Sequence, residues 1–527
     1  MTESPAAVSP LAPFRAPRFR VAWAAFLAAQ VVIWAQTVGA VDVITEASGS
    51  ATLVALIQTA ISVPGLVLAM FAGAVADVVN RRRMLVAASL AMAVAMMVLA
   101  GLTVADVATP AIVLVLTAAL GAGLAMFMPA FTATVPDLVP RPLLAPAMTI
   151  TNVSVNLARA AGPAMAGGVI AIAGAGGLFW VLAGVLIAVV GTLAVFGPPA
   201  AAPEHPERIA EAVRAGARYA WFSAPLRAVI LRTALFVLFG SAMWALLPLV
   251  AVRRLDMPAS GFGILLGCLG AGAVCIAAVL PRMEARLGLD AIVGAGSVVV
   301  AAAIAALTVV TSPVAAGLVL FVAGAAWISA LTGVITSTQV VVPAWVRGRA
   351  LAAWVLAYQG GFAVGGILWG FFADASLRVA LLVAAAALVA SVLAARVVRL
   401  PDLHGAELQP VRSWEDPFVV AEVDDEDGPV LVTVEYEVRD GDAQAFVAAM
   451  LDLSEIRRRD GALRWELYQD VADPTRFVET FASPTWGAHM RQHERVTQVD
   501  LPYEERVIEL TQGYTVHHLV SALRRSR

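Results

Sequence analysis

An arginine stands near the middle of an apolar stretch, at Arg159 between Asn152 and Gly168. A guanidinium at bilayer depth is costly unless it faces protein, water or an acid, so such a residue marks a functional site. Asn152 and Asn156 are four residues apart and lie near the same helical face as Arg159. These three side chains predict a polar binding cavity. The alternative is a structural arginine that is satisfied by backbone carbonyls.

Aromatic and amide side chains in other apolar stretches extend this candidate binding site. Such groups among apolar walls suit a bulky amphipathic small molecule. The further candidates are Trp34, Gln36, Gln58, Trp244, Gln339 and Gln359.

Titratable groups are scarce in the apolar stretches, and no carboxylate stands clearly in the middle of one. Asp42 and Glu46 end the first stretch, and Asp374 ends a later one. Proton relays in membranes are built from such groups, so Asp42 is our candidate for coupling to protons. The alternative is a plain anion at the membrane interface.

Two histidines, His489 and His493, are four residues apart in a polar segment, with Trp486 one turn earlier. On a helix this spacing can present two imidazoles to one metal. The sequence offers no evident third ligand. We therefore expect no metal there. The sequence does not support an enzyme active site, so we also expect no cofactor and no catalytic residues.

The composition places these residues in a membrane protein. The 527 residues are 60% hydrophobic and 14% charged, with a mean hydropathy of +0.83, whereas soluble domains are roughly 45–50% apolar and about 25% charged. Apolar runs near the ~20 residues that cross a bilayer follow one another between residues 20 and 400. Twelve membrane-spanning helices are expected, at about 20–43, 51–76, 84–102, 110–132, 147–172, 177–197, 228–251, 260–281, 289–311, 313–337, 350–373 and 377–397.

Charge in the connections orients these helices. Arginines gather in alternate connections, and only Arg253, Arg254 and Arg378 break the alternation. By the positive-inside rule both termini lie in the cytoplasm. The protein itself is expected in the cell inner (plasma) membrane. The chain has no lysine, so it has no phosphate-binding P-loop for driving transport with ATP. It has no basic nucleic-acid patch either.

The turn between the second and third runs carries Gly73, Asp77, Arg81, Arg82 and Arg83. This spacing resembles the loop between helices two and three of major facilitator superfamily transporters. The resemblance implies that Asp77, with Arg81 and Arg82, forms a cytoplasmic gate that holds the outward-facing state.

Gly162-Pro163 in the fifth run is similar to the antiporter motif of that superfamily, which favours export by exchange. An internal repeat supports two six-helix halves. At an offset of 203 residues, Val139-Pro140 matches Val342-Pro343, Gly162 matches Gly365 and Arg159 matches Phe362. The halves are expected at 20–197 and 228–400. The linker 198–227 between them is predicted to form an amphipathic helix at the membrane interface. The alternative is a solvated linker.

The composition changes after Pro401. A cytoplasmic tail at 1–19 and the transporter at 20–400 are followed by an acidic tether at 401–428 and a soluble domain at 429–527. The pattern there predicts strands at Val430–Val438, Leu463–Leu467, Arg476–Phe481 and Gly513–Leu519, with helices from Asp442 and from Ser483. This order is ferredoxin-like. The segment resembles small monooxygenase domains of antibiotic biosynthesis.

The whole chain resembles the bacterial branch that includes the enterobactin exporter and transmembrane secretion effectors. The resemblance implies an all-α transporter plus an α+β domain. We expect proton-coupled export of a hydrophobic or siderophore-like compound by alternating access, with the C-terminal domain regulating or dimerising the chain. The alternatives are import or facilitated passage of a small metabolite, and a membrane-tethered monooxygenase-like enzyme.

Overall fold

The computed structural model describes residues 11–78, 80–196, 217–277, 279–343, 346–394, 411, 419, 423–493 and 495–521. They form two compact units. The larger unit contains most of the apolar helices. The smaller contains a β-sheet with its helices and the adjoining segments 217–230, 336–343 and 346–353. Residues 198–216 of the expected linker and most of the acidic tether lie outside the described residues, while residues 217–222 are helical.

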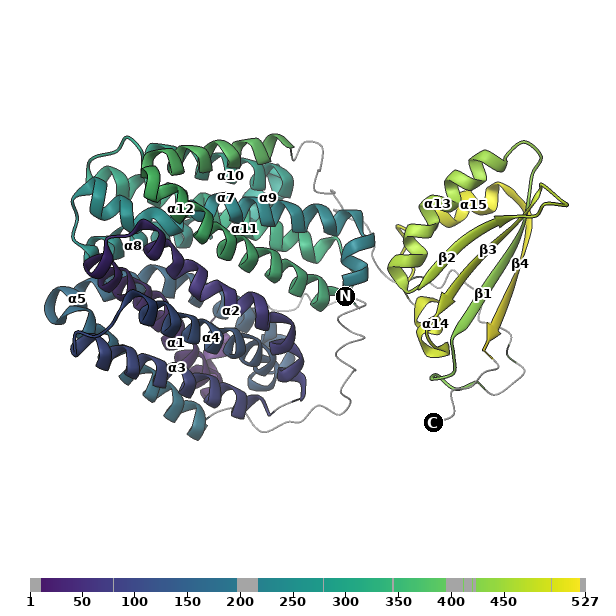
Figure 1. Ribbon diagram of the computed structural model, residues 1–527. Helices are drawn as coiled ribbons and strands as arrows, with labels where there is room; N and C mark the ends of the chain where they lie inside the picture. The colour runs from purple at the N-terminus through teal and green to yellow at the C-terminus, as the bar shows by residue number, and fades with distance from the viewer. Residues whose placement is uncertain are drawn as a thin grey trace, which may run out of the picture. The chain divides into compact units, whose positions relative to one another are not determined.

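The apolar helices fall into two groups, with α1–α5 in one and α7–α12 in the other (Figure 1). A short 3-10 helix, η1 (Ala12–Arg15), precedes the first group, and another, η2 (Arg141–Leu143), precedes α5. The bounds are α1 (Pro17–Ser48), α2 (Ala51–Val78), α3 (Arg81–Val104), α4 (Pro110–Leu138), α5 (Leu144–Phe196), α7 (Ala224–Leu255), α8 (Ala259–Ala277), α9 (Leu280–Leu287), α10 (Leu289–Ala306), α11 (Pro313–Val340) and α12 (Arg347–Ala394).

Among the described residues, nine helices are long and apolar enough to cross a membrane, and a bent pair, 261–277 with 280–287, makes a tenth candidate. Two of the nine exceed one bilayer crossing. The 53 residues of α5 would extend about 80 Å as one straight helix. Each long helix contains a non-helical residue: Gly174, with φ 69° in α5, and Ser376, with φ −164° in α12.

Local capping fixes several of these helix ends. Asn80 accepts hydrogen bonds from the backbone N–H groups of Arg82 and Arg83, which makes it the N-cap of α3. Thr109 caps α4 in the same way, and Pro110 follows at the first helical position. Gly49, in the left-handed region with φ 60°, ends α1. These three turns are therefore encoded by their own residues.

Glycines that match in the internal repeat make matching contacts. A Cβ on Gly162 of α5 would lie 3.0 Å from Trp34 Cβ in α1. A Cβ on Gly365 of α12 would lie 3.0 Å from the Leu238 carbonyl oxygen in α7. In both halves a helix that begins after a Val-Pro pair thus packs closely on the first helix of its own half, as small residues allow.

Helices α2 and α12 also approach closely, and this contact joins the two groups. A Cβ on Gly366 would meet Thr59 Oγ1 at 2.3 Å and the Ala55 carbonyl oxygen at 3.0 Å. Thr59 Oγ1 donates a hydrogen bond of 2.9 Å to the Ala363 carbonyl. A Cβ on Gly370 would lie 2.9 Å from Ala55 Cβ.

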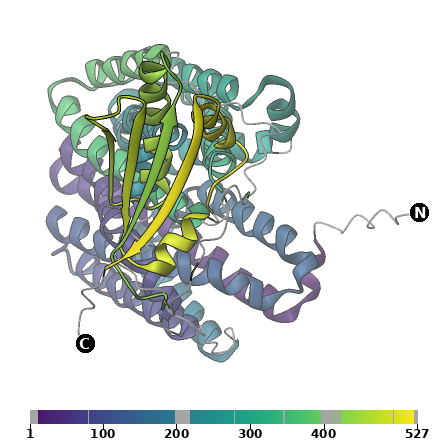
Figure 2. The same ribbon diagram turned by 90° about the vertical axis from the view of Figure 1, so that its right-hand side faces the viewer.

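The smaller unit contains a four-stranded antiparallel sheet in the order β2-β3-β1-β4 (Figures 1 and 2). One face of β1 is buried, because Val430, Val432, Val434 and Tyr436 alternate with more exposed residues and pack with Phe446 of α13. The sequence did not anticipate α15, which follows α14. The bounds are β1 (Val430–Val438), α13 (Ala443–Asp460), β2 (Arg464–Gln469), β3 (Arg476–Ser483), α14 (Trp486–His493), α15 (Leu501–Glu509) and β4 (Thr511–Val520).

A buried carboxylate is fully paired in the core of this unit. Glu479 of β3 has no exposed surface. It accepts hydrogen bonds from Tyr436 Oη at 2.8 Å and Trp465 Nε1 at 2.7 Å, and an ion pair with Arg457 Nε measures 3.4 Å. Burial and the Glu479 charge raise the pKa of Tyr436 well above its usual value.

Candidate functional site in the helical unit

Arg159 of α5 lies inside the larger unit, with only 6% of its surface exposed. Its guanidinium carbon is 5.0 Å from the centre of the Trp34 ring and 5.4 Å from that of Trp244. Both distances are within the range of cation–π attraction. One indole comes from α1 and the other from α7, so the arginine is held between the two helix groups.

An aromatic cluster continues from this arginine into α11 and α12. The Trp244 ring lies 5.7 Å from Trp34 and 5.5 Å from Trp327. Phe362 lies 5.9 Å from Trp327 and 5.1 Å from Tyr358. These separations are typical of interacting aromatic pairs. We call Arg159 with these five rings the Arg159 centre.

The fold places the centre through α5 and its repeat partner α12. Gly162, one turn after Arg159, lets the α5 backbone approach α1 at Trp34. Phe362, which matches Arg159 in the repeat, belongs to the same aromatic cluster. The Tyr358 hydroxyl lies within hydrogen-bonding reach of Arg159. Positions that match in the internal repeat, Arg159 and Phe362, therefore both lie in the Arg159 centre.

The centre is rich in buried donors. Arg159 Nε and Nη1 have no hydrogen-bond partner among the described residues, and neither do the indole N–H groups of Trp244 and Trp327. Arg159 has no ion pair in the described part of the chain. Guanidinium and indole groups donate only, and a buried donor without a partner costs free energy. The arrangement suits a ligand that carries hydrogen-bond acceptors or negative charge.

Other predicted site residues lie in varied surroundings. Gln36 is buried and donates from Nε2 to Thr117 Oγ1 at 2.8 Å, which links α1 to α4. Gln58 donates to Ser62 Oγ within its own helix at 3.3 Å. The Gln359 amide packs against Gly65 of α2. No described contact brings these amides to the Arg159 centre.

The polar residues nearest Arg159 in sequence also make local contacts. Asn156 donates to the Asn152 carbonyl of the preceding turn at 3.4 Å. Asn152 and Gln339 are exposed, and Asp42 is half-buried. Of the nine predicted binding residues, Arg159, Trp34 and Trp244 come together. Sequence reasoning missed Trp327, Tyr358 and Phe362, for which only the internal repeat, by matching Phe362 to Arg159, gave a signal.

The second helix group is tied to the α1–α2 turn by polar contacts. Asp374 of α12 accepts hydrogen bonds from the backbone N–H groups of Ala51 at 3.0 Å and Thr52 at 3.3 Å, and from the Thr52 hydroxyl. It therefore caps the N-terminus of α2 from the other half. Arg253 Nη2 of α7 donates to the Gly49 carbonyl at 2.5 Å.

Arg253 and Arg254, which break the alternation of charge, both bind backbone carbonyls. Arg254 Nε donates to the Val310 carbonyl beyond α10 at 3.1 Å. A cation that satisfies a helix end is favoured there whatever the side of the membrane. These arginines thus have structural roles.

The turn between α2 and α3 is anchored within the first helix group. Arg81 Nη1 contacts Asp137 Oδ2 at 2.9 Å and the Ala133 carbonyl of α4 at 2.9 Å. Arg82 donates to the Ala194 carbonyl of α5. The side chains of Gly73 and Asp77 lie outside the described residues, and Asp137 is a partner that the sequence did not suggest.

The sequence as a whole decides the family. Residues 8–527 match the family model of the transmembrane secretion effectors. The chain belongs to this family. Among curated proteins, none matches the chain.

Three solved structures with a fold similar to that of this transmembrane secretion effector are transporters. A POT family transporter in complex with 5-aminolevulinic acid has a TM-score of 0.61 at 12% identity, over 72% of this chain and 95% of that one. A bacterial homolog of the human lysosomal transporter Spinster, inward-facing and occupied, has a TM-score of 0.58 at 15% identity, over 73% and 95%. A nucleoside transporter has a TM-score of 0.61 at 12% identity, over 72% and 99%. The protein is a multi-pass membrane protein of the transmembrane secretion effector family, with the fold of these transporters.

Proposed function

We propose that this transmembrane secretion effector exports an amphipathic aromatic compound with an acidic or acceptor-rich group, of the drug-like or siderophore-like kind, against proton entry. The Arg159 centre carries the proposal. It combines one buried cation, which has no ion pair among the described residues, with rings from both helix groups. A substrate held between the groups is exposed to one side or the other as they rock, which is alternating access.

The energetics of the centre favour an anionic or acceptor-rich partner. Cation–π contacts of a desolvated arginine contribute about 2 kcal/mol each, which only partly offsets the burial of a guanidinium. A carboxylate or phenolate that reaches Arg159 would add charge-assisted hydrogen bonds. The same ligand's rings would stack among the indoles, so one molecule meets both demands.

The topology is proposed to be twelve spans with both termini in the cytoplasm of the inner membrane. The nine span-length helices and the bent pair give twelve if α5 and α12 each cross twice, about Gly174 and Ser376. The domain bounds 1–19, 20–400, 401–428 and 429–527 and a ferredoxin-like C-terminal domain complete the proposal. The sheet order β2-β3-β1-β4 supports that fold. A regulatory or dimerising role for this domain remains our hypothesis.

Polar contacts suggest how the carrier is held closed. In the proposed topology, Asp374 and Arg253 tie the halves together on the outer side. Arg81 and Arg82, with Asp77, are the proposed cytoplasmic gate, and Gly162-Pro163 lets α5 move against α1. Asp42, half-buried near the outer end of α1, remains the proposed proton-coupling acid.

Inverted membrane vesicles with an imposed pH gradient test the proposal. A panel of dyes, antibiotics and catecholate siderophores should include matched acidic and methyl-ester forms of the same aromatic compound. We expect substrate-induced proton movement for the acidic form. It should fall at least tenfold in Arg159→Ala and Trp244→Ala, and be retained in the exposed controls Arg83→Ala and Trp180→Ala.

Two results would contradict the proposal. Normal flux in Arg159→Ala would remove the arginine from the binding site. Equal transport of the ester and the acid would remove its role in recognising charge. Accumulation by intact cells, with no movement in inverted vesicles, would instead support the importer of a small metabolite.

A further inference from the structure

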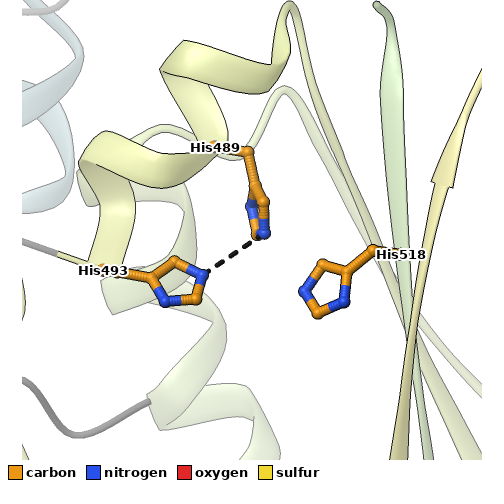
Figure 3. Close-up of side chains that lie close together, drawn as sticks. All are labelled: His489, His493 and His518. Carbon is orange, nitrogen blue, oxygen red and sulfur yellow. Dashed lines mark hydrogen bonds between the residues drawn. The ribbon is translucent and has the colours of Figure 1, made fainter. Parts of the chain in front are cut away.

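The C-terminal domain brings together three histidines from two elements that are distant along its chain. His489 and His493 lie on α14, and His518 lies on the edge strand β4 (Figure 3). One ring nitrogen from each residue lies within 4.8 Å of the other two. His518 pairs with Val432 of β1 in the sheet register. It therefore shares the sheet face that packs on the helices.

The two helical histidines are spaced as zinc ligands are. Their Nε2 atoms are 3.3 Å apart. Two nitrogens that bind one tetrahedral zinc at about 2.0–2.1 Å lie about 3.3–3.4 Å from each other. The planes of the His489 and His493 rings are nearly perpendicular, and the ring centres are 4.9 Å apart. The third ring, His518, has its centre 5.0 Å from that of His489.

Neighbouring side chains hold this arrangement in place. His489 Nδ1 lies 3.4 Å from Gln492 Oε1. A hydrogen bond at Nδ1 directs the Nε2 lone pair toward a metal, as outer-shell partners do at metal sites. His489 is fully buried and His493 is 5% exposed. Trp486 contacts both His489 and His518.

Burial and the neighbouring histidines lower the pKa of His489 to about 4.

We propose that His489, His493 and His518 bind one zinc ion in the C-terminal domain. The ion would join α14 to the edge strand β4, with a fourth position left for water or another ligand. The His518 nitrogen has to approach its partners by about 1–1.5 Å to complete a tetrahedral site. A side chain on an edge strand can make this adjustment. The inference does not depend on what the transporter carries.

The test uses the full chain, purified in detergent through a tag without histidine and treated with a chelator. Titration with ZnCl2 should show one ion per chain, and Co2+ should give the strong visible absorption of a tetrahedral site. His489→Ala and His518→Gln should each lower zinc affinity at least tenfold. His517→Ala is the matched control, because His517 is exposed on the opposite face of the same strand.

Thermal unfolding provides the second measurement. Zinc should raise the unfolding temperature of the C-terminal domain in the native chain and in His517→Ala, but not in His518→Gln. His518 is half-buried on an edge strand, so this variant should fold even if His489→Ala does not. Absence of zinc binding by the native chain would overturn the proposal. So would an equal loss of affinity in His517→Ala and His518→Gln.

Discussion

Removing the carboxylate of Asp374 should open the proposed outer gate. This side chain accepts hydrogen bonds from Ala51 and Thr52 at the N-terminus of α2, although it belongs to α12. Replacing an N-cap aspartate by alanine costs about 1 kcal/mol and up to about 2. Since these bonds join the two halves, that cost falls on the closed state. The equilibrium between closed and open forms should shift by about 5- to 30-fold.

Cysteine labelling measures this shift. Ala55 of α2 has no exposed surface and packs on Gly370 of α12. In a chain in which Cys268 and Cys275 are replaced by serine, Ala55→Cys should react slowly with an impermeant maleimide added outside intact cells. Adding Asp374→Ala should raise the labelling rate by about 5- to 30-fold.

Two comparisons separate the cap from its charge. Asp374→Asn keeps an oxygen that accepts from the α2 amides, so its labelling rate should fall between those of the native residue and alanine. Glu46→Ala removes an exposed acid at the end of α1 and should leave the rate unchanged. A rate that stays the same or falls in Asp374→Ala would refute the role of this contact as an outer gate.

Three further changes test other parts of the structure. Gly366→Val should block transport, since its side chain would enter the α2 backbone; normal flux would contradict close α2–α12 packing. Arg81→Ala should slow transport several-fold, because the ion pair with Asp137 is lost. Reversing the charges at both positions should restore part of the transport rate. A loss of substrate affinity alone would count against gating. Tyr436→Phe should destabilise the C-terminal domain by about 1–2 kcal/mol at pH 7 through the lost Glu479 hydrogen bond, as denaturant unfolding of the full chain would show.

The raised pKa of Tyr436 also predicts a dependence on pH. A group whose pKa is higher in the folded state contributes its stability below the unfolded pKa, here about 10, and loses it as pH rises further. The native domain should therefore lose stability above about pH 10, and Tyr436→Phe should lose less. Parallel curves for the two proteins in thermal unfolding at pH 9 to 11 would contradict this.

The sequence alone located the apolar runs, and several helix ends are set by residues that lie beside them. Hydropathy and capping act over a few neighbouring residues, so the apolar runs and turns such as Asn80 and Gly49 follow from local chemistry. The strand β1 was evident for the same reason, because its alternation of buried and exposed residues is local. Arg159 was also evident, since one charge inside an apolar run is conspicuous without any structure.

Tertiary structure alone decided what surrounds those residues. A helix that is apolar all round does not reveal which side meets protein and which meets lipid. The sequence therefore did not show that Gln36 would pair with Thr117. Nor did it show that Trp327, Tyr358 and Phe362 would join the Arg159 centre. The third histidine was hidden for a similar reason. His518 reaches His489 and His493 because sheet pairing places β4 beside β1, and no spacing along the chain records that proximity.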